Sequence, residues 1–255
     1  LGALASFVSV KAKDEALIGL SARGLLDRKG ETFDFRHPLT RDVAYAALDP
    51  KLRPQMHAAL GAHLAKTSHA RGLPAAIIAR HFAKGDEGDR AADFYLEAAN
   101  SARLGYQTQL AIRYYMKALA QLDKADVRKL QAHEALESLF RMLGRRRDRV
   151  RHLDALRRCA RRIGTPRAAC LALLRSARFD LDEGMLSRGL PLAKQAALVS
   201  HTSSFGDVEI EAELLVSELS RELGDVQGAL AASDRALAAS NPTVNAQVPA
   251  RFRAD

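Results

Sequence analysis

Residues 184–196 read Gly-Met-Leu-Ser-Arg-Gly-Leu-Pro-Leu-Ala-Lys-Gln-Ala, and residues 224–236 read Gly-Asp-Val-Gln-Gly-Ala-Leu-Ala-Ala-Ser-Asp-Arg-Ala. In both, a glycine is followed by small residues at i, i+4 and i+7: Gly189, Ala193, Ala196 and Ala229, Ser233, Ala236. A third copy after Gly105 has Ala111, Tyr115 and Ala118. Small side chains at this spacing let one helix approach another closely. The pattern therefore predicts tightly paired helices.

The glycines that precede these triplets recur with a fixed period. Gly105, Gly144, Gly184 and Gly224 lie 39, 40 and 40 residues apart, each between two long amphipathic segments. A period of this size predicts a helical-hairpin solenoid, with a permissive backbone at each turn. The segment after Gly144 departs from the pattern, because it presents Arg149, Leu153 and Leu156 instead of small residues.

The first 50 residues contain the one convincing β signal. A helix is expected over residues 14–22 with Asp14 at its N-cap, and strands over 25–28 and 32–36 flank a Lys29-Gly30 turn. A helix followed by a hairpin is typical of the end of a winged-helix domain. Pro38 then opens a helix with Leu39, Val43, Ala46 and Ala47 on its expected buried face, and Pro54 opens the next.

Composition narrows the class of protein. Of 255 residues, 47% are hydrophobic and only 5% aromatic, with no Trp, which favours a helical core over a β-sandwich or barrel. No apolar run approaches the roughly 20 residues of a membrane-spanning helix, and no secretory leader is recognisable. We expect a cytoplasmic protein without membrane association. Because residue 1 is Leu, we expect a piece of a longer polypeptide.

Two resemblances carry these expectations further. The triplets, with Tyr95, Ala99 and Ala102 before them, resemble degenerate tetratricopeptide repeats from residue 91 onward. The segment Phe33-Asp-Phe-Arg-His-Pro-Leu-Thr-Arg-Asp-Val-Ala-Tyr45, followed by Arg53 and His57, resembles a segment found after the ATPase domain of bacterial STAND-type signalling proteins. This resemblance implies a full-length ATPase linked to a serine/threonine kinase or an adenylate cyclase. It also implies three regions: the end of a winged helix (1–50), a helical connector (51–90) and repeats (91–255).

Signatures of catalysis are missing from the sequence. It has no Gly-Lys-Ser/Thr phosphate loop, no kinase H-R-D or D-F-G triplet and no G-x-S-x-G elbow, so we expect no catalytic residue and no cofactor here. His37 is expected to cap the helix at Pro38. His57 and His63 lie six residues apart, too far round a helix to share a metal, and no metal site is expected. Cys159 and Cys170 are expected to pack in a hairpin interior, with a redox switch as the weaker alternative.

Arginine is concentrated in one stretch. Between residues 141 and 167 there are eleven arginines and two aspartates, which accounts for the whole net charge of +9. If Val150, Leu153, Leu156, Ala160 and Ile163 face the interior, a positive surface is left on the other side of the helix. We predict a candidate interaction surface there, formed by Arg145, Arg146, Arg147, Arg151, Arg158, Arg161 and Arg162.

Three interpretations of this surface stay open: solvated surface charge, a site for an acidic or phosphorylated protein partner, and a nucleic-acid site, in that order. The sequence thus predicts a non-catalytic region that binds a partner protein, or another domain of its own polypeptide, on the concave face of the solenoid. The alternative is a fragment of a transcription regulator that binds DNA through the winged helix or the arginine-rich face.

Overall fold

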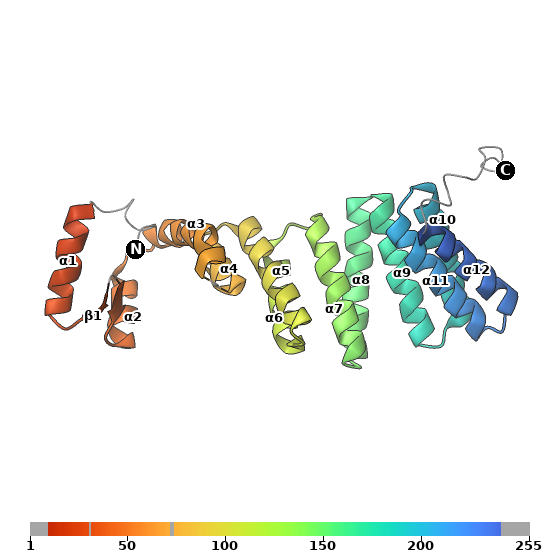
Figure 1. The fold of residues 1–255 in the computed structure, drawn as a ribbon, viewed down its shortest axis with the longest axis horizontal. Helices are drawn as coiled ribbons and strands as arrows, with labels where there is room; N and C mark the ends of the chain where they lie inside the picture. Colours follow the sequence, from red (N-terminus) through yellow and green to blue (C-terminus); the bar gives the residue numbers. More distant parts are fainter. Residues whose placement is uncertain (1–9, 31, 72–73, 241–255) are drawn as a thin grey trace. The chain divides into compact units, whose positions relative to one another are not determined.

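The structure, a computed structural model, describes residues 10–30, 32–71 and 74–240 (Figure 1). These residues form twelve helices and one two-stranded sheet. The chain divides into two compact units, residues 1–122 and 123–255. No helix in the described ranges combines the length and apolarity needed to cross a bilayer. The boundaries inferred at residues 50 and 90 stay predictions.

The predicted β-hairpin is present. Helix α1 (Val10–Ala22) leads into strands β1 (Leu26–Lys29) and β2 (Thr32–Phe35), which pair antiparallel with Leu26 opposite Phe35. Gly30 in the turn has φ +62°, a conformation that glycine adopts without steric cost. Helix α1 begins four residues earlier than predicted, at Val10.

Helix α2 (Pro38–Ala47) corrects two expectations. Its predicted buried face is exposed: Leu39 is 73% and Val43 60% accessible, because the described residues place no element over this face. His37 does occupy the N-cap position, yet its side chain makes no capping hydrogen bond. The extended backbone of His37 and the fixed φ of Pro38 suffice to start the helix.

The rest of the first unit is two pairs of helices. α3 (Leu52–Arg71) packs on α4 (Ala75–Lys84), and α5 (Gly88–Leu104) forms a hairpin with α6 (Thr108–Gln121). Helix α3 starts two residues before Pro54, since the Asp49 carbonyl accepts hydrogen bonds from the Leu52 and Arg53 amides. Their core contains Phe82 and Tyr95, with Ala111, Tyr115 and Ala118 buried as predicted.

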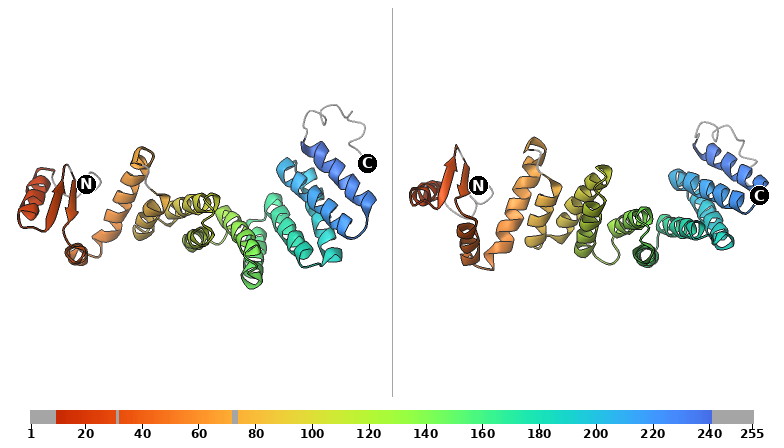
Figure 2. Two further views of the ribbon diagram at one scale, coloured as in Figure 1. Left: turned by 60° about the horizontal axis from the view of Figure 1, so that its bottom comes forward. Right: turned by 90° about the horizontal axis from the view of Figure 1, so that it is seen from below.

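The second unit consists of three further hairpins. They pair α7 (Val127–Met142) with α8 (Arg146–Ile163), α9 (Pro166–Asp182) with α10 (Leu186–Thr202), and α11 (Gly206–Glu222) with α12 (Val226–Ser240) (Figure 2). Helix α9 packs on both α10 and α11, so each hairpin stacks on the next. The core lies between them and includes Ala193, Ala196, Leu215 and Leu219.

The turns within the hairpins follow the glycine period. Gly144, Gly184 and Gly224 have φ +66°, +71° and +82°, as expected for glycine at a helix C-terminus. In the first repeat, Tyr106 takes the positive φ of +56° in place of Gly105. Between hairpins, Thr165 caps α9 by accepting a hydrogen bond from the Ala168 amide at 3.3 Å.

Candidate protein-interaction surface

Helix α8 is divided into a buried and an exposed face. Leu153, Leu156 and Ala160 are buried as predicted, while Val150 and Ile163 are half-buried. All seven arginines of the candidate surface are exposed: Arg145, Arg146, Arg147, Arg151, Arg158, Arg161 and Arg162. The division follows from helical periodicity, because apolar residues recur every three to four positions on one side.

The exposed arginines differ in their partners. Arg145 pairs with Asp148 at 2.6 Å, and Arg146 pairs with Glu183 of α9 at 2.7 Å. The other five form no ion pair with any residue that the structure describes. We call these five the arginine stripe: Arg147, Arg151, Arg158, Arg161 and Arg162. Their guanidinium groups are available to external anions.

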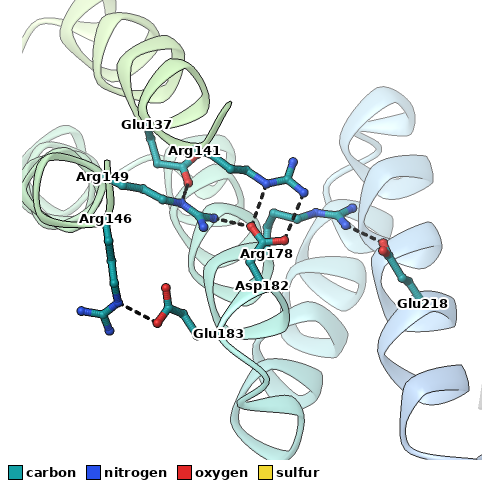
Figure 3. A network of polar contacts seen from close by, with 8 residues as sticks. All are labelled: Glu137, Arg141, Arg146, Arg149, Arg178, Asp182, Glu183 and Glu218. Carbon is teal, nitrogen blue, oxygen red and sulfur yellow. Dashed lines mark hydrogen bonds and ion pairs between the residues drawn. The ribbon is translucent and has the colours of Figure 1, made fainter. Parts of the chain in front are cut away.

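One arginine of α8 is buried and belongs to a network (Figure 3). The Arg149 side chain is 6% exposed; its Nε lies 2.6 Å from Glu137 Oε1, and its Nη2 lies 2.7 Å from Asp182 Oδ2. Arg141 Nε approaches the same Asp182 oxygen at 2.7 Å. The network joins α7, α8 and α9, so Arg149 holds the hairpin together and is no part of the accessible surface.

The Glu137–Arg149 pair explains why the segment after Gly144 departs from the repeat pattern. Arg149 stands where the later repeats have Gly189 and Ala229, and Glu137 stands where they have Ala177 and Ser217. Two small residues are replaced together by a buried ion pair. The signal in the sequence was a carboxylate twelve positions before the unexpected arginine, at the position that faces it across the hairpin.

The cations of α9 are neutralised within the fold. Arg175 lies 2.9 Å from Glu134 of α7 and 2.7 Å from Glu211 of α11, while Arg178 pairs with Glu218 and Arg167 with Asp207. These partners are 36 to 41 residues apart in sequence, close to one repeat. The surface formed by α7, α9 and α11 is therefore internally compensated, in contrast to the arginine stripe.

Two histidine pairs were missed by sequence analysis. His133 Nδ1 lies 3.1 Å from His152 Nδ1, and the His152 ring stacks on Phe140. Burial, with the nearby His152, lowers the pKa of His133 to about 4. His57 Nδ1 lies 2.9 Å from His81 Nδ1, and burial lowers the pKa of His81 to about 4. Each pair joins two helices, so no spacing within one helix indicates it.

Neither these histidines nor the cysteines gather into a larger cluster. Within the described ranges, no three potential ligands lie close enough to hold a metal ion. Cys159 and Cys170 are buried in different core clusters, with their Sγ atoms nearest the carbonyls of Asp126 and Ala196. Burial raises the pKa of both thiols, which disfavours the reactive thiolate and supports the core-packing interpretation.

Comparison with known proteins identifies the fold. No family model matches the sequence, and no curated protein matches it. The structure is similar to that of aspartyl phosphate phosphatase F from Bacillus subtilis, with a TM-score of 0.54 and 18% identity, over 79% of this chain and 54% of that chain. It is also similar to BtubC (BKLC) from P. vanneervenii, with a TM-score of 0.58 and 16% identity, over 92% of this chain and 93% of that one. The chain thus has an all-α, tetratricopeptide-like helical-hairpin fold.

Proposed function

We propose that this chain is the non-catalytic, partner-binding region of a larger signal-transduction ATPase linked to a kinase or a cyclase. The helical-repeat fold supports a role in protein–protein interaction. The proposed link to an ATPase comes from the resemblance of residues 33–45, followed by Arg53 and His57, to the segment after the ATPase domain of STAND-type proteins. Partner binding would bias the attached enzyme between two states through different contacts in each.

The observation that carries the proposal is the contrast between α8 and α9. Arginines of α9 are paired with carboxylates of neighbouring helices, whereas the arginine stripe of α8 forms no ion pair with a residue in the described ranges. Guanidinium groups bind carboxylates and phosphates bidentately, so an acidic or phosphorylated protein surface fits this stripe. The earlier expectation of binding at the concave face stays a prediction.

The test is capture of partners by the purified chain, followed by titration of each captured protein in purified form. The variant Arg151→Glu/Arg158→Glu reverses two charges of the stripe and should weaken binding by about tenfold or more. The matched control Arg113→Glu/Lys124→Glu makes the same charge change at exposed residues of α6 and the turn after it. It should change the affinity by less than about twofold.

The same variants in the full-length protein test the regulatory part of the proposal. We expect the response of its ATPase to the partner to disappear in Arg151→Glu/Arg158→Glu and to persist in the control. Equal binding by both variants, together with an unchanged ATPase response, would overturn the proposal.

A further inference from the structure

A groove runs beside the arginine stripe, between α8 and α10, with α9 as its floor. It encloses about 740 Å³, within the range of ligand-binding clefts. Leu173, Leu192 and Val199 contribute half-buried apolar surface, and Arg157 and Arg161 stand at the rim. None of the described residues that line it is acidic.

The next repeat contains the equivalent groove, between α10 and α12 over α11. A shift of 40 residues relates part of one lining to part of the other: Ala169 corresponds to Glu209, Leu173 to Glu213, and Gln195 to Arg235. This second groove is smaller, about 370 Å³. The two grooves share a backbone arrangement and differ in their side chains.

Hydrogen-bonded pairs of acidic and basic side chains line the second groove. Glu213 accepts hydrogen bonds from Arg235 at 2.7 and 2.8 Å. His201, which corresponds to Arg161, lies 2.7 Å from Glu209. Carboxylates of α11 thus meet basic side chains of α10 and α12, so the carboxylates of the second groove have partners within the chain.

The first groove has two arginines, Arg157 and Arg161, and no carboxylate among the described residues that line it. Arg161 forms no ion pair with any described residue, and Arg157 donates to Ser176 Oγ at 2.8 Å while reaching Asp154 at 3.3 Å. At the positions of the two glutamates stand Ala169 and Leu173, which leave apolar surface open to solvent. A ligand that supplies both carboxylates and apolar side chains would complete it.

We propose that the α8–α10 groove binds an acidic amphipathic helix of a partner protein. Its leucine-like side chains would pack on Leu173, Leu192 and Val199, and its carboxylates would pair with Arg161 and Arg158. The partner would thereby supply what Glu209 and Glu213 supply inside the next repeat. Among the lining residues that the structure describes, there is no aromatic side chain on which a nucleic-acid base could stack. This inference rests on the proposed function and locates its binding site.

The probe for this groove is a fluorescent synthetic peptide of about 18 residues, roughly 27 Å long as a helix, with leucines at i and i+4 and glutamates beside them. Its binding to the full chain is measured by anisotropy. The variant Leu173→Glu/Gln195→Arg copies the Glu213–Arg235 pair into the open groove and leaves the net charge unchanged. We expect it to weaken peptide binding by about tenfold or more.

A second comparison does not depend on that double variant folding. Arg161→Glu and Arg113→Glu make the same charge change at exposed residues, but Arg161 lines the groove, whereas Arg113 lies on α6 and outside the arginine stripe. Arg161→Glu should weaken binding at least about fivefold and Arg113→Glu less than about twofold. A peptide with serines in place of the leucines should bind as weakly as the original peptide binds Arg161→Glu.

Three outcomes overturn the groove proposal. The two single variants weaken peptide binding equally, or a folded Leu173→Glu/Gln195→Arg variant binds the peptide as the wild type does. The third is that the wild-type chain does not bind the peptide. If a captured partner binds that double variant normally but fails to bind Arg151→Glu/Arg158→Glu, the groove proposal falls and the proposed function stands. If the captured partner binds both double variants normally, the groove proposal and the proposed function are both overturned.

Discussion

Glu137 and Arg149 form a buried ion pair in a position that other repeats fill with small residues. Taking both charges out of water costs free energy, which their attraction and the Asp182 contact offset. Removing one partner leaves the other charge buried without its main compensation. Removing both returns the site to the chemistry of Ala177 and Gly189 one repeat later.

We therefore expect Glu137→Ala to lower the free energy of unfolding by about 3 kcal/mol. The double variant Glu137→Ala/Arg149→Ala should lose less than the sum of the two single changes by at least about 1 kcal/mol. Urea unfolding of the wild type, the two single variants and the double variant measures these free energies. Additive losses would show that the two side chains are not coupled.

The His133–His152 pair makes stability depend on pH. Burial lowers the pKa of His133 from 6.5 to about 4, so between these values the unfolded chain binds more protons than the folded chain. The stabilisation is complete above pH 6.5, declines as the pH falls through 6.5, and is fully lost below about pH 4.

His133→Gln should flatten this part of the profile. We expect the difference in unfolding free energy between pH 7 and pH 4.5 to shrink by about 1–2 kcal/mol, allowing for the partial exposure of His133. Urea titrations at both pH values measure it, with the exposed His37→Gln as control. An equal pH dependence in the wild type and His133→Gln would contradict the assignment.

At the scale of helices, chain direction changes at residues with positive φ. Gly144 has φ +66°, and Ala there would meet no side chain but would have to adopt a left-handed backbone. Gly206, the first residue of α11, also has open space around it and has an ordinary φ. Comparing Gly144 with Gly206 isolates the cost of the positive φ, because a Cβ would meet no neighbouring atom at either position.

We expect Gly144→Ala to lower the free energy of unfolding by about 1 kcal/mol. Gly206→Ala should raise it by about 0.5 kcal/mol, because Ala restricts the unfolded chain. Thermal and urea unfolding of the two variants provide the comparison. If both substitutions stabilise the protein, the turn at Gly144 does not need glycine.

At the scale of the whole molecule, three core clusters of the described residues each lie inside one compact unit. The cluster around Phe82 and Tyr95 uses residues before 123 only, and the clusters around Leu156 and Leu215 use residues after it. Repeat proteins gain their stability from neighbouring repeats, so a unit that contains its own clusters can fold alone.

A fragment of residues 123–255 should accordingly keep its helical circular dichroism and unfold cooperatively in urea. Glu137→Ala should lower the urea midpoint of the fragment as it lowers that of the full chain. The reason is that the whole Glu137–Arg149–Asp182 network lies inside the fragment. A fragment without a cooperative transition would show that the second unit requires residues 1–122.

The sequence alone determined the hairpin repeat. Two local features predict it: glycines 39 and 40 residues apart, and triplets of small residues such as Gly189, Ala193 and Ala196. Two helices of one hairpin need small residues to pack closely, and this need does not depend on where the hairpin lies in the molecule. Periodicity also identified which arginines of α8 are exposed. It failed at Leu39 and Val43, since an apolar stripe indicates a face that can be buried but not whether an element covers it.

Only the tertiary structure decided which charges have partners. Arg175 meets Glu134 and Glu211, and Arg149 meets Asp182, because stacking brings together residues that are about one repeat apart in the chain. The same holds for the two equivalent grooves: one contains the Glu213–Arg235 pair, and the other has Arg161 at its edge and no carboxylate among its described lining residues. Local sequence sets the shape of each repeat, whereas the contacts between repeats determine which surface is left for a partner.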